Sequence, residues 1–289
     1  MLKFFIDSDC DFTLKETKEL GVEMISMPYI IGEKTYYPYV DTPEVDFKEF
    51  YNILRGGVIP KTCALSPLDY VAYFEPHFAN GDDIIYVHFS AAMSGTFNAM
   101  HLALEELKEK YPERKFYSVD TKAITCLGYA IAKEGIRLWK EGKSGDEIVK
   151  AIEDFRDHYA IYFYSDDLKF FAKSGRVSNF AAFMGGLIGL HPVISICDDG
   201  VMRSVAKGRG KRNTLKKLVE YMKEIGDEVE KHPIYLAHSD DDGTLDELES
   251  ILKEELGNDI VLQRIMVNPT AGSHCGPNNV GLCFHSKRR

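Results

Sequence analysis

The sequence IIYVHFSAAMSGTFNAMHLALEELKEKY, residues 84–111, contains a complete strand–loop–helix unit. Its first six residues are mostly apolar, as in a strand that is buried on both faces. Apolar side chains from Phe97 to Tyr111 recur at helical spacing, and the loop before them carries Ser94-Gly95-Thr96. A further apolar run, 116–119, follows the helix. This order predicts parallel strands joined by crossover helices.

The same alternation extends over the first 157 residues, which we predict to form a three-layer α/β/α domain with a parallel sheet. A short hairpin arm at 34–39 belongs to a small predicted insertion around residues 32–56. The other expected strands are 4–6, 22–31, 84–89 and 116–119, and the expected helices are 14–20, 46–55, 67–78, 97–111, 126–141 and 145–158.

Strands predominate after residue 158, so we expect a second, two-layer α/β domain over residues 158–289. The turn Asp198-Asp199-Gly200 joins two expected strands directly, which predicts an antiparallel pair and hence a mixed sheet. The apolar, glycine-rich segment 179–190 is compatible with a short buried helix or with a lid over an apolar ligand. The expected strands are 160–164, 193–196, 201–205, 234–237, 260–266 and 281–284, with helices at 213–225 and 245–256.

Charge argues against a nucleic-acid partner, because the chain has 35 Lys and Arg against 45 Asp and Glu, a formal net charge of -10. One block, residues 201–219, differs from this balance. Its seven basic and no acidic residues are typical of a solvated face, or of a surface that docks an acidic partner or anionic lipid headgroups in transient membrane contact. They are Arg203, Lys207, Arg209, Lys211, Arg212, Lys216 and Lys217.

The six cysteines are scattered without a C-x-x-C pair, which favours reduced thiols and gives no indication of a metal site. The N-terminus becomes acidic at Asp7, too early for a signal peptide, and no apolar run approaches bilayer length. We therefore expect a cytoplasmic protein without a metal ion or another cofactor.

Two loops that bear hydroxyl groups, Pro60–Pro67 and Ser94–Thr96, precede expected helices. Their hydroxyls and unpaired backbone N–H groups suit a carboxylate or phosphate, although Ser and Thr at such positions are often plain helix caps. His274 lies in a polar segment, 273–279, which we expect to be a loop. In a rigid turn before Gly276-Pro277, its imidazole N–H could face an anion.

Common catalytic motifs are missing: the chain has no phosphate-binding P-loop, no G-x-G-x-x-G and no G-x-S-x-G. An enzymatic alternative remains in Asp7 and Asp9, which follow the first strand. They could serve as nucleophile and general acid around magnesium, as in haloacid-dehalogenase-like phosphatases, with metal-binding acids from residues 238–242. Against this, Asp11 stands where that class usually has Thr or Val.

Five segments occur in an order that matches a known family: Ile6–Asp9, Pro60–Pro67, Ser94–Thr96, Phe171–Ser178 and His274–Pro277. On these segments the chain resembles, over essentially its full length, the DegV family of bacterial fatty-acid-binding proteins. It departs from the family pattern at residues 63–65 and at Asn278, near the expected headgroup site.

The resemblance implies two α/β domains with a long-chain fatty acid such as palmitate in a tunnel between them. It assigns the carboxylate to Thr62 and Ser94, and places His274 in the same polar cluster; the Gly95 N–H would complete the set of donors. The apolar segment 179–190 would line part of the tunnel. The resemblance further implies a lipid-binding protein that is not itself an enzyme and has no catalytic residue. Such a protein serves lipid transport or presents the acid to a separate fatty acid kinase.

Overall fold

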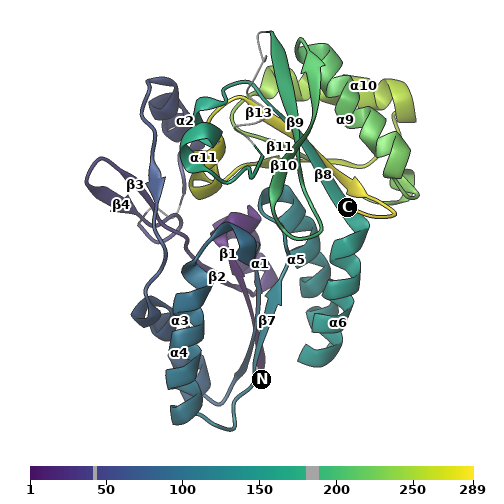
Figure 1. The fold of residues 1–289 in the computed structure, drawn as a ribbon. Coiled ribbons are helices and arrows are strands. Elements are labelled where there is room, and N and C mark those ends of the chain that lie inside the picture. The colour runs from purple at the N-terminus through teal and green to yellow at the C-terminus, as the bar shows by residue number, and fades with distance from the viewer. Residues whose placement is uncertain (42–43, 180–188) are drawn as a thin grey trace.

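Two large β-sheets organise the chain, one from each half of the sequence (Figure 1). The computed structural model describes residues 1–41, 44–179 and 189–289. The first sheet has four parallel strands in the order β2-β1-β6-β7, which confirms the predicted parallel sheet. Its strands are β1 (Leu2–Asp7), β2 (Glu23–Ile25), β6 (Asp83–His88) and β7 (Phe116–Asp120).

Helices cover both faces of this sheet, because successive strand residues point to opposite sides. Phe5 and Tyr86 pack with α3 (Pro67–Ala79) and α4 (Thr96–Lys110). The neighbouring Phe4 and Val87 pack on the other side, with α5 (Thr125–Lys140) and α6 (Gly145–Phe155). The predicted three-layer arrangement is therefore confirmed.

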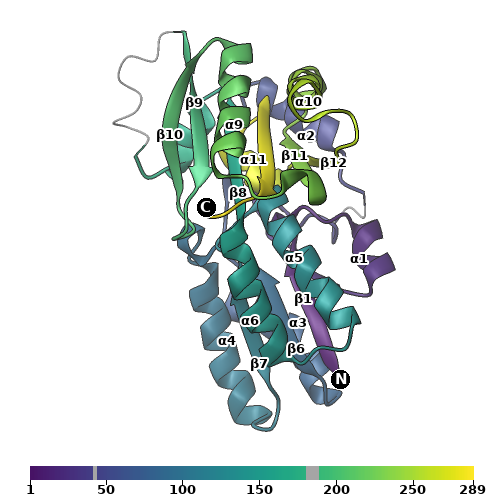
Figure 2. The same cartoon turned by 90° about the vertical axis from the view of Figure 1, so that its right-hand side faces the viewer.

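The second sheet is mixed, as predicted, with the strand order β10-β9-β8-β13-β11-β12. β11 and β12 run parallel, and the other neighbouring pairs run antiparallel. In Figure 2, α9 (Lys211–Ile225) and α10 (Asp242–Leu256) lie over this sheet, and α5 and α6 lie below it. The strands are β8 (Tyr159–Ser165), β9 (Leu190–Ile196), β10 (Met202–Arg209), β11 (Ile234–His238), β12 (Leu262–Met266) and β13 (Asn279–His285).

The inner face of the second sheet packs against the first half of the chain. Ile161, Ile194 and Cys283 on this face belong to the same hydrophobic core as Phe4 and Val87. The chain passes between the halves through a short 3-10 helix, η3 (Arg156–His158). The domain boundary at residue 158 stays a prediction, because the two halves share this core.

A small antiparallel sheet, β4-β3-β5, stands beside the two large ones (Figure 1). The single strand predicted at 22–31 is wrong, because its two ends, β2 and β3, belong to different sheets. Pro28 separates them and has no N–H for a continuous ladder. The small sheet comprises β3 (Tyr29–Ile31), β4 (Lys34–Tyr36) and β5 (Lys61–Thr62), and α2 (Phe47–Arg55) packs beside it.

α2 connects this small sheet to the second half of the chain. Phe50, Tyr51 and Leu54 form a buried cluster with Phe170. The Tyr51 hydroxyl donates to the carbonyl of Val267 at 2.8 Å. The insertion thus packs on the C-terminal half, although it is connected in sequence to the first half.

Several short elements complete the described chain. The predicted polar loop at 273–279 is partly wrong, because residues 273–275 form the last turn of a helix, α11. Residues 180–188 of the predicted lid lie outside the described residues. None of the helices in the described ranges combines the length and apolar character that crossing a membrane requires. The short elements are η1 (Ser8–Cys10), α1 (Leu14–Leu20), η2 (Ala91–Met93), α7 (Lys169–Ser174), η4 (Val229–Lys231) and α11 (Pro269–Cys275).

Candidate functional site

The topology of the first sheet creates a crevice at the carboxyl ends of β1 and β6. These strands are neighbours, but α1 after β1 lies on the α5 side of the sheet and α4 after β6 lies on the opposite side. Ligands of open α/β sheets bind at such a switch point. Asp9 enters this region from the segment after β1, and Ser94 enters it from the segment after β6.

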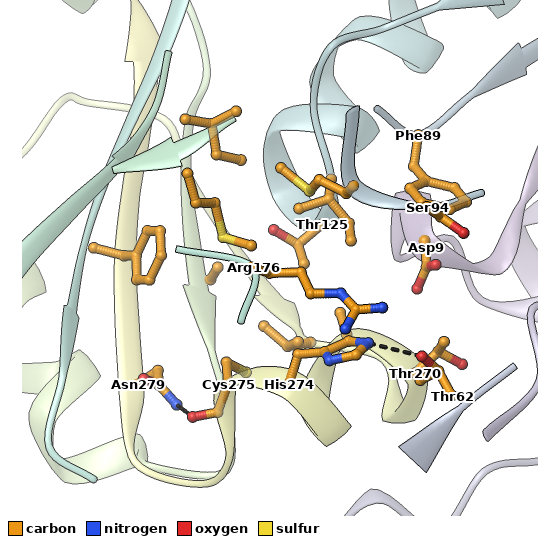
Figure 3. A pocket seen from close by; sticks show the side chains of 18 of the residues that line it. Asp9, Thr62, Phe89, Ser94, Thr125, Arg176, Thr270, His274, Cys275 and Asn279 are labelled. Carbon is orange, nitrogen blue, oxygen red and sulfur yellow. Dashed lines mark hydrogen bonds between the residues drawn. The ribbon is translucent and has the colours of Figure 1, made fainter. Parts of the chain in front are cut away.

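A pocket that is partly open to solvent lies between this edge and the inner face of the second sheet (Figure 3). Its walls are mainly apolar and come from both halves of the chain. They include Met27, Phe89, Met93, Ile124, Ile161, Phe163, Phe171, Ile196, Met202, Ala237 and Val267.

Three of the four predicted site residues line this pocket: Thr62, Ser94 and His274. Pairing of β5 with β3 positions Thr62 opposite Tyr29, and the last turn of α11 carries His274. Thr62 Oγ1 and His274 Nε2 are 2.9 Å apart (Figure 3). Gly95 is not among the lining residues and forms the N-cap of α4.

His274 is neutral at pH 7, because burial, and secondarily the charge of Arg176, lower its pKa to about 4. A neutral imidazole carries one N–H. When that proton is on Nε2, His274 donates to Thr62 Oγ1, and the Thr62 hydroxyl proton is free to donate to a ligand. The pair can therefore orient a donor toward the pocket without adding a charge.

Helix capping and pocket lining are divided between different hydroxyls of the first loop. Ser66 is the N-cap of α3, forms a capping box with Asp69, and is followed by Pro67 at the first helical position, as predicted. Thr62 has no capping role. In the second loop, Ser94 Oγ accepts from the N–H of Thr96 at 3.2 Å. The prediction that the hydroxyls of this loop are ordinary helix N-caps is thus correct for Ser66 and wrong for Thr62.

Arg176 is a pocket residue that our sequence analysis did not single out. α7 ends at Gly175, whose φ of 66° is left-handed, and the next residue extends a half-buried guanidinium into the pocket (Figure 3). Its Nη1 donates to the carbonyl of Ser174 at 2.6 Å. Among the described residues no carboxylate lies within ion-pair distance of it. The sequence does contain a feature that could have indicated Arg176: within the segment 171–178, this arginine directly follows a glycine that ends a helix.

The aspartates after β1 do not form the predicted alternative, a phosphatase centre. Asp7 is fully buried, and its carboxylate accepts from the N–H groups of Phe89 (2.9 Å) and Asp9 (3.0 Å) and from the Tyr86 hydroxyl (3.0 Å). Burial raises the pKa of Asp7 to about 7. These bonds occupy the carboxylate and fix the loop, so a nucleophilic role has no geometric support.

The later acidic cluster also serves other contacts. Asp240 pairs with Arg55, and Asp241 caps α10 by accepting from the N–H of Thr244 at 3.0 Å. Neither lines the pocket. Within the described ranges, no group of three or more His, Cys, Asp or Glu side chains is arranged to hold a metal ion.

Comparison with known proteins gives a consistent result over the whole chain. A family model described as "Uncharacterised protein, DegV family" matches residues 1–287. A DegV domain-containing protein of Clostridium perfringens is 32% identical over 288 residues, covering 98% of each chain. Another from Caldanaerobacter subterraneus is 25% identical over 281 residues, covering 97% of each chain.

Solved structures show the same fold. A DegV family protein of Thermus thermophilus, described by its fatty acid binding, aligns with a TM-score of 0.86 at 22% identity and covers 99% of each chain. A stearic acid-binding protein of Eubacterium ventriosum also aligns at 0.86, with 21% identity and 99% coverage of each chain.

Proposed function

The chain belongs to the DegV family, and from this premise we propose that it binds a long-chain fatty acid, such as palmitate, in the pocket between its two halves. The observation that carries the proposal is the combination of apolar and polar side chains that line the pocket. Apolar walls from both sheets share the pocket with the polar side chains of Thr62, Ser94, Arg176 and His274 (Figure 3). Fatty acid binding by the Thermus thermophilus and Eubacterium ventriosum proteins supports it.

The apolar walls supply most of the binding free energy. Each buried CH₂ contributes roughly 0.8 kcal/mol, so a chain of about sixteen carbons gains on the order of 10 kcal/mol. This gain is not specific for a particular head group. Specificity for an acid has to come from the polar end of the pocket.

At that end, the carboxylate must be paired because an unpaired buried charge is costly. The hydroxyls of Thr62 and Ser94 are neutral donors, and Arg176 supplies a positive charge without a carboxylate partner among the described residues. The Gly95 N–H remains a proposed fourth donor, next to Ser94 in sequence. An alcohol or an ester of the same length would leave Arg176 without its partner.

We further propose that the protein carries the bound acid or presents it to a separate fatty acid kinase, and that it performs no chemistry itself. Cys63 lines the pocket beside Thr62 and is exposed. The head-group end of the pocket therefore lies near solvent, where a second protein can reach a carboxylate.

Contact of the basic block 201–219 with a membrane surface is a separate proposal, and ion pairs reduce the charge available for it. Arg212 pairs with Glu247 at 3.2 Å and Lys211 with Asp241 at 3.8 Å, so α10 supplies acids that the block itself lacks. Binding that depends on anionic lipid in a vesicle assay would support the contact.

The direct test is extraction of purified, denatured protein with organic solvent, followed by mass spectrometry. We expect about one long-chain fatty acid per chain. An empty extract, together with magnesium-dependent phosphatase activity that Asp7→Asn abolishes, would replace lipid binding with the enzymatic alternative. Transfer of phosphate from ATP to the bound acid, seen only when a fatty acid kinase is added, would test presentation.

A further inference from the structure

Asp9 brings a carboxyl group into the pocket that already has a proposed carboxylate ligand. Its side chain points from η1 toward the end where Thr62 and His274 lie (Figure 3). The residue is only 3% exposed. Its Oδ1 is buried and has no hydrogen-bond partner among the described residues. A buried polar atom without a partner is costly, and here it belongs to a carboxyl group that lines a ligand cavity.

The surroundings of Asp9 disfavour a second negative charge. Burial, and then the nearby carboxyls of Asp7 and Asp11, raise the pKa of Asp9 well above its ordinary value, although hydrogen bonding from Asn268 and the Ala271 N–H opposes the shift. The other titratable or charged groups around this end come from several elements. They are Cys10 of η1, Tyr86 of β6, Cys63 after β5, Arg176 after α7, and His274 and Cys275 of α11.

The charges do not balance when an ionised fatty acid binds beside an ionised Asp9. Arg176 compensates one negative charge, and His274 is neutral. Two neighbouring carboxylates disfavour each other's ionisation, so such pairs commonly hold one proton between them. The Asp9 carboxyl group lines the pocket and can therefore donate this proton to the ligand.

We propose that Asp9 is protonated in the complex and donates a hydrogen bond from its carboxyl group to the carboxylate of the fatty acid. No covalent bond forms or breaks. Where Asp9 is ionised in the free protein, binding takes one proton from solvent onto its carboxyl group. This inference rests on the proposed fatty acid binding and adds a proton-linked head-group residue to it.

The experiment is calorimetric titration of delipidated, full-length protein with dodecanoate, kept below its micellar concentration, between pH 6.5 and 9. Dodecanoate is ionised throughout this range, since simple carboxyl groups titrate near pH 4. Buffers of different ionisation enthalpy reveal protons taken up on binding. We expect proton uptake to rise toward one per ligand as pH increases, and Kd to weaken by about tenfold per pH unit above the pKa of Asp9.

Asp9→Asn is the decisive variant, because its amide can donate at every pH. We expect it to bind with a Kd that is nearly independent of pH and without heat that depends on the buffer. Asp11→Asn is the matched control: it removes a carboxylate from the same loop, but Asp11 does not line the pocket. We expect this control to take up a proton on binding as the wild type does, but from a lower pH upward, because one of the charges that raise the pKa of Asp9 is gone.

If Asp9→Asn does not fold, Asp9→Ala, which has no donor at this position, is compared with the wild type. A wild-type Kd that stays constant to pH 9 without proton uptake, together with the same Kd for Asp9→Ala, overturns the role of Asp9 but leaves fatty acid binding intact. Equal proton uptake by the wild type and Asp9→Asn also overturns it. If no fatty acid binds at any pH, both this inference and the proposed function fail.

Discussion

Thr62 and His274 are 212 residues apart in the sequence, yet their side chains form one hydrogen-bonded unit at the polar end of the pocket. Burial lowers the pKa of the imidazole to about 4, so at pH 7 the ring is neutral. We propose that it holds the threonine hydroxyl in place. In this proposal Thr62 is the donor that faces a ligand, and His274 acts through it as a positioning residue.

Removing only the hydroxyl of Thr62 tests this arrangement. Thr62→Val keeps the volume of the side chain but leaves the fatty acid carboxylate and the His274 imidazole each short of a partner. A lost partner of this kind costs about 1–3 kcal/mol, so we expect Kd to rise about 5- to 150-fold. Titration with a fluorescent fatty acid measures the change. Adding Ser94→Ala should weaken binding further.

Ser66→Ala is the matched control from the same loop. Ser66 caps α3 and does not line the pocket. We expect a loss of about 1 kcal/mol in the free energy of unfolding and an unchanged Kd. If Thr62→Val and Ser66→Ala instead had the same small effect on Kd, the assignment of Thr62 to the head-group site would be wrong.

Asp11 gives a prediction about pH and stability. Burial raises its pKa from 3.8 to about 7, so the folded protein binds more protons here than the unfolded chain between these values. The protonated Asp11 carboxyl therefore contributes its full stability to the fold below about pH 4, and this contribution is lost as the pH rises through 7. Asp11→Asn removes this loss, and its amide oxygen can still accept from Asn268.

We expect Asp11→Asn to exceed the wild type in stability at pH 8 by up to about 4 kcal/mol, with a difference that shrinks toward pH 4. Urea unfolding of both proteins across this range measures it. The comparison has to be a difference, because His88 and His274, whose pKa values are lowered to about 4, stabilise the fold as pH rises from 4 to 6.5. A constant difference over the range would contradict the prediction.

At the scale of elements, periodicity predicts what is long and regular. β6 and α4 fall close to their expected bounds because both carry a repeated apolar pattern. α11 was missed because its sequence, PTAGSHC, has little helix propensity. Tertiary context forms it: Asn268 caps its first turn, accepting from Thr270 and Ala271, and Asp11 holds Asn268 in turn.

The candidate site was predictable only in part, for a related reason. Thr62, Ser94 and His274 stand in segments whose order matches the family, so resemblance brings them together. Asp9 and Arg176 belong to such segments too, but their direction depends on the backbone. A left-handed Gly175 turns Arg176 inward, and the position of β1 beside β6 aims the loop of Asp9 at Ser94. No pattern in the sequence predicts the direction of either side chain.

In a row across the second sheet, two small residues beside Phe163 leave space in the pocket. Phe163, Gly281 and Ala237 are register partners on β8, β13 and β11, and all three line the pocket. A Cβ at Gly281 would stand 3.2 Å from the Cβ of Phe163 and 3.6 Å from that of Ala237. Larger side chains in this row would take space from the ligand.

Ala237→Leu is therefore expected to shift selectivity toward shorter acids, because its added carbons occupy part of the tail's volume. Affinity for a sixteen-carbon acid should fall at least about tenfold, while that for a ten-carbon acid changes less. Competition binding across a chain-length series measures the shift. Ala160→Val adds bulk on the opposite face of the same sheet, and we expect it to lower stability but keep the wild-type selectivity.

At the scale of the whole molecule, the pocket lies within the interface that joins the two halves. One hydrophobic core runs from the first sheet through α5 to the inner face of the second sheet, and pocket residues such as Ile161, Phe163 and Ile196 belong to it. A tail bound as proposed would extend this core. Ligand binding and packing of the halves would then be parts of the same burial of apolar surface.

This coupling predicts that removing the ligand destabilises both halves together. At a free ligand concentration of 100 times Kd, binding adds about 2.7 kcal/mol to the free energy of unfolding. For a chain of this size we expect delipidation to lower Tm by roughly 5–10 °C, in a single transition. Calorimetry of the extracted and reloaded protein measures the shift. Two separate transitions, of which only one moved with ligand, would mean that the halves unfold independently and that the shared core does not couple them.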